Sequence, residues 1–207
     1  MNAKLTARTP LQERSRVRVG QMLQTAEALL AEHGMSGFSI PVLAERLGFP
    51  RATIYKFFPT PYTLLNKLAE QHLAALEQAL YERARAQPRS ADWRQVTRVM
   101  VAAAADYYRS QPVACILLLG GPVSDESYRA LEYSINRLGR LTHNMLLQAG
   151  LTMKDDPCEA ALAIEFGTAS LRMSYFLHQT ITPLYIEAAV DAMIAFIEKR
   201  QAAAQGR

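Results

Sequence analysis

Apolar residues recur at intervals of three and four positions along almost the whole chain, and no long segment alternates at every second position. This spacing is typical of helices that bury one face, so it predicts an all-α fold. Glycine and proline interrupt the pattern and divide it into about nine helices. The expected helices cover residues 14–33, 39–47, 50–58, 61–86, 91–109, 112–119, 124–149, 157–180 and 183–203.

Positive charge is concentrated at one end of the chain. The net charge of the protein is +4, and residues 1–60 carry all of it, because Lys and Arg balance Asp and Glu in the remainder. Such a segment is expected to meet a polyanion. We therefore predict a DNA-binding domain over residues 1–60 and a ligand-binding and dimerisation domain over residues 61–207. A connector helix over 61–86 begins the second domain.

The basic segment contains the spacing of a helix-turn-helix. Ala44 is small enough for a second helix to cross over it, and Gly48 can adopt the positive φ that the turn needs. Ile54 provides an apolar anchor that points back to the first helix. Gly48 follows Ala44 by four positions and Ile54 follows Gly48 by six. This spacing predicts that Ala44, Gly48 and Ile54 form the core of a DNA-binding helix-turn-helix.

The second helix of this motif is bracketed by proline in the stretch GFPRATIYKFFPTP, residues 48–61. Pro50 presets φ at its start, and the sequence PTP limits its length. Its cations can pair with guanine edges or phosphates, its methyl and aromatic groups can meet thymine methyls, and its hydroxyls can reach phosphates. Core packing is the alternative for the aromatics, and we expect it for Phe58. The predicted outer face consists of Arg51, Thr53, Tyr55, Lys56 and Phe57.

The stretches EHGMSGFS, LAERLGF and ATIYKFF, within residues 16–68, resemble the TetR family of transcriptional regulators. The resemblance implies that Ser39 caps the second helix beside a phosphate and that Tyr55 contacts a phosphate. It also implies that Thr53, Lys56 and Phe57 contact bases. Beyond residue 90 the resemblance is one of length and helix count alone.

Two positions depart from the family pattern. Where the family often has a phosphate-binding Lys at the start of the fourth helix, this chain has Pro61, which lacks both the cation and the backbone N–H. We expect Arg14, Arg16 and Arg18 to replace that contact, and a solvated helix start is the alternative. Phe57 stands where a polar residue is common, which favours a thymine-rich contact.

Two-fold pairing is the usual way for a short recognition helix to bind DNA tightly, so we predict a homodimer. The last two helices carry stripes of small and apolar residues, and the resemblance implies that paired copies form a four-helix bundle. The alternative is that both stripes are core of a single chain. The predicted interface consists of Ile164, Gly167, Leu171, Ser174, Ala189, Met193 and Ile197.

Apolar walls with a few hydroxyls and one imidazole would suit a small organic effector that is apolar or amphipathic. Ordinary core packing is the alternative for each of these residues. The predicted ligand-binding residues are Met100, Tyr107, Tyr108, His143, Phe166 and Met173.

The sequence shows no signal peptide and no apolar run long enough to span a bilayer, so we expect a cytoplasmic protein that is not bound to a membrane. Its histidines are scattered and no catalytic, metal or cofactor motif is present, so we expect no enzyme, metal or cofactor. The predicted function is a repressor that binds a palindromic operator as a homodimer and is released by an effector. An all-α interaction protein with a degenerate helix-turn-helix is the alternative.

Overall fold

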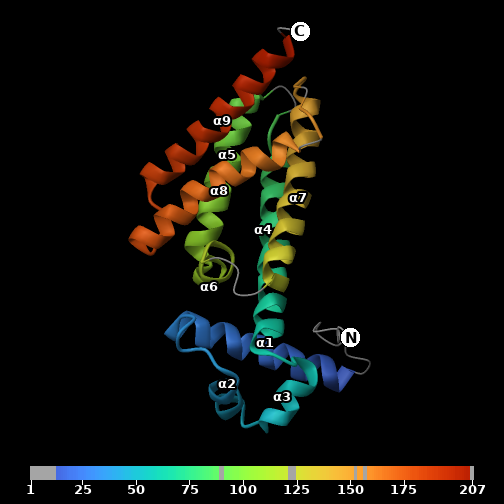
Figure 1. The fold of residues 1–207 in the computed structure, drawn as a ribbon, viewed down its shortest axis with the longest axis vertical. Helices are drawn as coiled ribbons and strands as arrows, with labels where there is room; N and C mark the ends of the chain where they lie inside the picture. Colours follow the sequence, from blue (N-terminus) through green and yellow to red (C-terminus); the bar gives the residue numbers. More distant parts are fainter. Residues whose placement is uncertain (1–12, 89–90, 121–124, 152, 156–157, 206–207) are drawn as a thin grey trace. The chain divides into compact units, whose positions relative to one another are not determined.

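A computed structural model describes residues 13–88, 91–120, 125–151, 153–155 and 158–205, and these residues form an arrangement of helices (Figure 1). Among them, extended pairing is limited to a single bridge between Asp155 and Cys158. The prediction of an all-α fold with about nine helices is confirmed. The elements are α1 (Glu13–His33), α2 (Ile40–Leu47), α3 (Arg51–Phe57), α4 (Pro61–Arg85), α5 (Trp93–Ser110), α6 (Pro112–Ala114), η1 (Cys115–Leu119, one stretch of π-helix), α7 (Asp125–Gln148), α8 (Glu159–His178) and α9 (Pro183–Gln205).

The chain forms two compact units. Unit 1 contains the residues up to His72 together with Pro112–Tyr128, and unit 2 contains Leu73–Gln111 together with the residues from Arg129 onward. Helices α4 and α7 each begin in unit 1 and continue in unit 2. Unit 1 therefore extends beyond the 1–60 domain expected from charge, since the core of this unit includes side chains from later in the chain.

The core of unit 1 explains that extension. One face of α1, spaced at three and four residues, packs against α2, and the first turns of α4 add three leucines to the same cluster. Val113 of α6 is also buried there, with 3% of its surface exposed. The buried members are Met22, Leu23, Ala26, Leu29, Leu30, Ile40, Leu43, Ala44, Ile54, Phe58, Leu64, Leu65, Leu68 and Val113.

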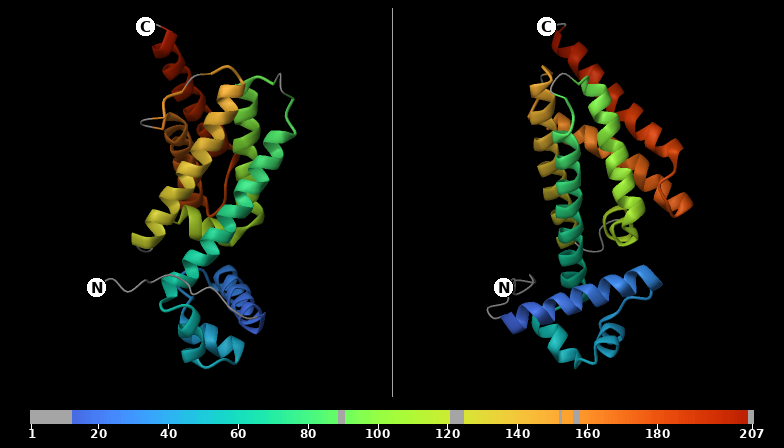
Figure 2. Two further views of the ribbon diagram at one scale, coloured as in Figure 1. Left: turned by 90° about the vertical axis from the view of Figure 1, so that its right-hand side faces the viewer. Right: turned by 180° about the vertical axis from the view of Figure 1, so that it is seen from behind.

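In unit 2, α8 and α9 pack along one another and α5 packs against α9 (Figure 2). The Ser174 hydroxyl holds the turn between α8 and α9, because it accepts from the N–H of Thr182 at 2.9 Å and donates to the carbonyl of Thr180 at 2.9 Å. The guanidinium of Arg109 donates to the carbonyl of Ile181 at 2.8 Å, which ties the end of α5 to the same turn.

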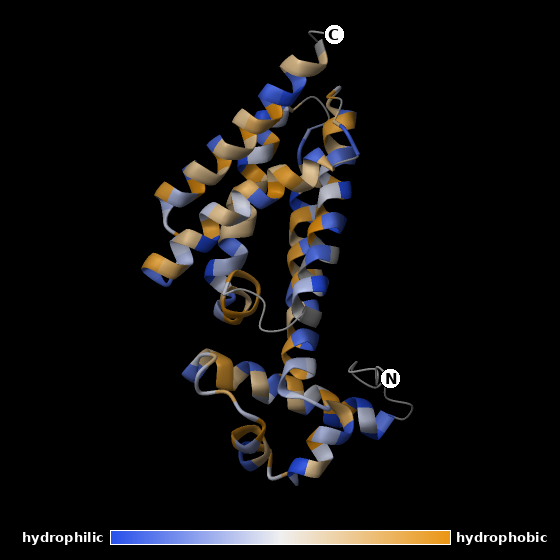
Figure 3. Ribbon diagram, viewed as in Figure 1, coloured by the Kyte–Doolittle hydropathy of each residue, from blue (hydrophilic) through white to orange (hydrophobic). Residues whose placement is uncertain are grey.

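Polar residues lie along the outer edge of α7 (Figure 3). On this helix Arg137 forms an ion pair of 2.5 Å with the buried carboxylate of Glu77 on α4. None of the helices in the described part of the chain combines the length and apolar character that crossing a lipid bilayer requires.

Candidate functional site

The sequence folds α2 and its following turn through local hydrogen bonds. The Ser39 hydroxyl accepts from the N–H of Val42 at 3.4 Å, which caps the start of α2. Gly48 ends the helix with a φ of 63°, a conformation that costs other residues about 1–2 kcal/mol. The N–H of Phe49 then donates to the carbonyl of Ala44 at 3.0 Å, so the chain leaves α2 in a tight turn.

Two apolar anchors hold α3 against the rest of unit 1. Ile54 has no exposed surface, and Phe58, four residues later, is 1% exposed. The N–H of Phe58 donates to the carbonyl of Ile54 at 2.8 Å, and the N–H of Thr53 donates to that of Pro50 at 2.8 Å. Each buried anchor of this size contributes about 1.5–3 kcal/mol. The opposite side of α3 is therefore fixed in an outward position.

That outward side carries three polar residues that the fold leaves free. Arg51, Tyr55 and Lys56 are exposed, and among the described residues none of them has a hydrogen-bond or ion-pair partner. Thr53 is half-buried beside them. Phe57 is also half-buried and packs against the core, so only part of its ring is accessible to a base. Two cations and a phenol thus form an exposed, positively charged helix face.

The basic residues at the start of α1 are exposed as well. Arg16 lies 3.7 Å from the carboxylate of Glu13, whereas Arg14 and Arg18 have no ion-pair partner among the described residues. These two arginines are available for phosphate, and Arg16 would first have to leave its acidic neighbour.

Another cation of unit 1 is already used within the fold. The guanidinium of Arg46 on α2 forms two hydrogen bonds, of 2.5 and 2.6 Å, with the carboxylate of Glu32 on α1. The pair lowers the pKa of Glu32 and raises that of Arg46 through this hydrogen bonding and the attraction between the charges. It cross-links α1 and α2 and removes Arg46 from the set of free cations.

The start of α4 shows how Pro61 is accommodated. The N–H of Thr60 donates to the Thr63 hydroxyl at 3.3 Å, and the N–H of Thr63 donates to the Thr60 hydroxyl at 3.2 Å. This reciprocal cap satisfies the helix end internally, and Pro61 at the first helical position has no N–H to offer.

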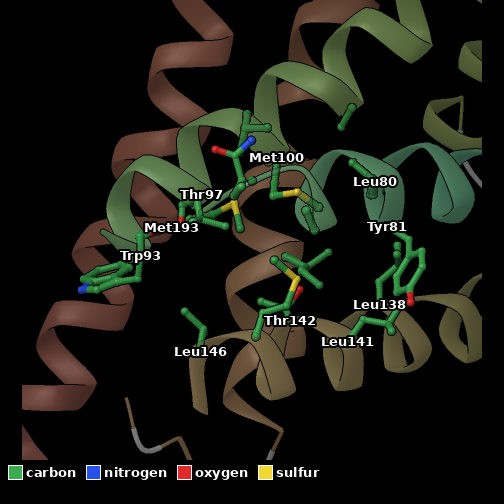
Figure 4. Close-up of a pocket in the computed structure, with 18 of the residues that line it drawn as sticks. Leu80, Tyr81, Trp93, Thr97, Met100, Leu138, Leu141, Thr142, Leu146 and Met193 are labelled. Carbon is green, nitrogen blue, oxygen red and sulfur yellow. Dashed lines mark hydrogen bonds between the residues drawn. The ribbon is translucent and has the colours of Figure 1, made fainter. Parts of the chain in front are cut away.

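Unit 2 contains a cavity of about 1080 Å³ between α4, α5, α7, α8 and α9 (Figure 4). Trp93 and Leu146 lie at one end, and Leu138 and Tyr81 lie toward the other. Thr97, Met100, Thr142 and Met193 line the middle. Apolar carbon and sulfur therefore make up most of the wall.

The cavity contains part of the predicted ligand-binding set. Met100 and Tyr108 line it, whereas Tyr107, His143, Phe166 and Met173 are not among the described residues that do. Tyr107 follows a different helical face from Tyr108, and His143 has its Nδ1 3.4 Å from Asp155. Phe166 packs edge-on against Phe196 at 5.1 Å, and Met173 is 52% exposed. Their sequence neighbours on the same helices, not these residues, face the interior.

Sequence reasoning missed three of the five residues of α5 that line the cavity at regular spacing. Trp93, Thr97, Met100, Ala104 and Tyr108 all line it, at spacings of three and four residues along α5. Extending the helical period from Met100 and Tyr108 in both directions would have identified the other three. That these residues line a cavity could be recognised only once the helices that surround α5 were known.

The predicted dimer interface is corrected by the structure. All of its members except the half-buried Ile164 are buried inside a single chain, because α8 and α9 pack on each other through these stripes. A Cβ added at Gly167 would lie 2.6 Å from the sulfur of Met193, which shows how closely the two helices approach. The residues concerned are Gly167, Leu171, Ser174, Ala189, Met193 and Ile197. These stripes therefore form part of the core of a single chain, which was the alternative considered in the sequence analysis.

A family model for bacterial regulatory proteins of the tetR family matches residues 22–68, from α1 to the first turns of α4. The resemblance seen in the sequence is thereby confirmed. This family consists of DNA-binding transcription regulators and not of enzymes. A comparison with the curated proteins finds no match.

Solved structures share the fold over nearly the whole chain. A TetR-family transcriptional regulator from Streptomyces coelicolor is 20% identical, with a TM-score of 0.68 and coverage of 88% of this chain and 99% of that one. RolR in complex with resorcinol is 16% identical, with a TM-score of 0.70 and coverage of 94% and 95%. The multidrug binding protein EbrR, complexed with imidazole, is 13% identical, with a TM-score of 0.66 and coverage of 89% and 90%.

Proposed function

Because the chain belongs to the TetR family of bacterial transcription regulators, we propose that it binds a palindromic DNA operator as a homodimer. It represses transcription in the cytoplasm until a small organic effector enters the cavity of unit 2. The observation that carries this proposal is the free, positively charged face of α3 on a helix held rigidly by buried anchors.

In the proposed complex, α3 enters the major groove. Arg51 and Lys56 contact guanine edges or phosphates, Tyr55 contacts a phosphate, and Thr53 and the accessible part of Phe57 meet thymine methyls. Ser39 brings the capped start of α2 beside a phosphate, as helix N-termini commonly do. Arg14 and Arg18 supply the backbone contact for which Pro61 is unsuited.

The dimer is supported by apolar side chains that α8 and α9 leave on the surface. Phe176 is 53% exposed and Leu184 is 69% exposed, and exposed apolar residues recur along α8 at helical spacing. A second copy of the chain would cover this outer face, which consists of Leu162, Phe166, Met173, Phe176, Leu177 and Leu184. It replaces the inner stripes as our proposed dimer interface.

Regulation follows from which helices line the cavity. Helices α4 and α7 both contribute lining residues in unit 2, and both begin in unit 1. Helix α5 also lines it and is followed, after Gln111, by α6, whose Val113 belongs to the core of unit 1. An effector that shifts these helices would bias unit 1, and coupling of this kind is typically worth about 1–3 kcal/mol. The resorcinol-bound and imidazole-bound neighbours with this fold support a small organic effector.

The alternative is an interaction protein whose helix-turn-helix no longer binds DNA, which the loss of a cation and an N–H at Pro61 favours. Selection of bound sequences from random duplex DNA separates the two. We expect enrichment of an inverted repeat whose half-sites lie one or more helical turns apart. An Arg51→Ala/Lys56→Ala variant, run in parallel, should enrich nothing. Absence of any enriched sequence with the wild-type protein would reject the regulatory function.

A further inference from the structure

We propose that the cavity of unit 2 binds an elongated, largely apolar molecule with one negatively charged end, and that Arg85 binds that end. The role of this molecule as an effector rests on the proposed regulatory function, whereas its binding rests on the features of the cavity alone. Four features of the lining lead to this chemical class: its length, its apolar walls, the lack of carboxylates and the position of one guanidinium.

The cavity is long. Its lining residues on α5 extend from Trp93 to Tyr108, fifteen positions apart, which corresponds to about 22 Å along a helix. Lining residues on α4 extend in the same manner from Leu76 to Arg85. A compact, globular ligand would leave much of this length empty, so an extended molecule fits better.

The walls suit an apolar body. Met100, Met145 and Met193 contribute flexible thioether side chains that adapt to the shape of a ligand. The hydroxyl of Thr97 already donates to the carbonyl of Trp93 at 2.9 Å, so it is not a free donor in the middle of the cavity. Most of the ligand would therefore be held by dispersion and by release of water.

Charge in the lining has one sign. No Asp or Glu is among the described residues that line the cavity, and Arg85 is the single Lys or Arg among them. A cationic ligand buried in this cavity would have no counter-charge, which is energetically costly, and it would also be repelled by the positive charge of Arg85. The lining therefore selects against cationic compounds and favours one negative charge.

Arg85 is in a position to hold that charge. Its guanidinium lies 5.6 Å from the centre of the Tyr81 ring and has no carboxylate partner among the described residues. Gln87, which follows Arg85 by two positions and carries an amide side chain, lines the cavity as well. A guanidinium can form two parallel hydrogen bonds with a carboxylate, which would fix the orientation of the ligand.

Trp93 allows a direct test, because it is the single tryptophan of the chain and it lines the cavity. Its fluorescence can be titrated with dodecanoate, with methyl dodecanoate and with dodecyltrimethylammonium, each below its micelle-forming concentration. These probes share a twelve-carbon chain and differ in the charge of one end. We expect dodecanoate to bind roughly tenfold more tightly than the ester, because of the charge-assisted pair with Arg85, and the cation to bind most weakly.

Variants of α4 assign the preference to one residue. Arg85→Gln should reduce the affinity for dodecanoate to that for the ester and leave the ester unchanged, and Arg85→Lys should retain most of the preference. Arg83→Gln is the matched control, because Arg83 is exposed on α4 as Arg85 is but is not among the described residues that line the cavity. The proposal is overturned if the cation binds as tightly as the anion, if no probe binds, or if Arg85→Gln keeps the preference.

The titration needs no DNA, so it fails or succeeds independently of the regulatory function. Anion-selective binding to a protein that enriches no DNA sequence would retain this inference and reject the repressor. Operator binding without anion selectivity in the cavity would retain the repressor function and reject this inference.

Discussion

Ile54 and Lys56 stand two positions apart on α3, yet Ile54 has no exposed surface, whereas Lys56 is exposed and has no partner within the described part of the chain. Two positions on a helix rotate a side chain by about 200°, so a single short helix can be anchored on one side and free on the other. The same distinction separates Phe58, which is buried, from Tyr55, which is 44% exposed. Arg51, Tyr55 and Lys56, which we assign to DNA, are all exposed and have no hydrogen-bond or ion-pair partner among the described residues.

Glu159 supplies a residue-scale prediction for unit 2. Its side chain is 4% exposed, and its carboxylate accepts from the N–H of Lys154 at 3.0 Å and from the guanidinium of Arg200 at 2.6 Å. Burial alone would raise the pKa of Glu159, but these hydrogen bonds and the attraction of the nearby cations outweigh it and lower the pKa below its ordinary value. Glu159→Gln should reduce the free energy of unfolding at pH 7 by about 1.5–3 kcal/mol, as measured by urea titration.

The sign of the pH dependence follows from the lowered pKa. The ionised form is favoured in the folded state, so this contribution is complete above the unfolded pKa and is lost as pH falls through the folded one. The difference between Glu159→Gln and the wild-type protein should therefore shrink as the pH is taken below about 4. Glu187→Gln, exposed on α9, is the control. If Glu159→Gln lowered the free energy of unfolding by the same amount at pH 7 and below about pH 4, the ionic role of Glu159 would be contradicted.

At the scale of elements, the start of α1 makes a prediction that depends on salt. Arg14 and Arg18 are free among the described residues, and each phosphate contact contributes about 0.9 to the slope of log affinity against log salt. Arg14→Ala/Arg18→Ala should make that slope less steep by about 2 if both contact phosphates. Fluorescence anisotropy with the enriched operator measures it. Arg83→Ala/Arg140→Ala, which removes the same charge from unit 2, should leave the slope unchanged; an unaltered slope in the α1 variant would reject its role.

The positions of most helices could be predicted from the sequence, because glycine, proline and capping residues mark their ends locally. Ser39 and Gly48 are examples, and both occupy the predicted caps of α2. The π-helical winding of Cys115–Leu119 could not be predicted, since the apolar run there shows no period that distinguishes it from an α-helix. Its contribution to unit 1 depends on a contact between segments that are distant in sequence.

The candidate sites were predictable to different extents for the same physical reason. The helix-turn-helix lies within a continuous segment, so Ala44, Gly48 and Ile54 specify it by spacing alone. Periodicity also identified the buried stripes of α8 and α9, but it shows that a face is covered and not whether a partner chain or the same chain covers it. Gly167 and Met193 were assigned to a dimer for that reason, whereas they pack on each other.

For the whole molecule, the exposed apolar face of α8 and α9 predicts the oligomeric state. Sedimentation equilibrium should show a dimer at micromolar concentration. Phe176→Asp should shift the protein to monomer, because it places a charge in the apolar contact between copies. Val17→Asp introduces the same charge at an apolar residue of α1 that is equally exposed, and it should remain a dimer. A wild-type monomer, or a dimeric Phe176→Asp variant, would contradict this interface.

The proposed function depends above all on α3 as the element that contacts DNA bases. The most direct test is the affinity of the enriched inverted repeat for Lys56→Ala compared with Lys67→Ala, a lysine of α4 whose ammonium lies 2.8 Å from Glu70. We predict that Lys56→Ala weakens operator binding by about 1–3 kcal/mol and that Lys67→Ala binds like the wild-type protein. Wild-type affinity in the Lys56→Ala variant would contradict the central claim.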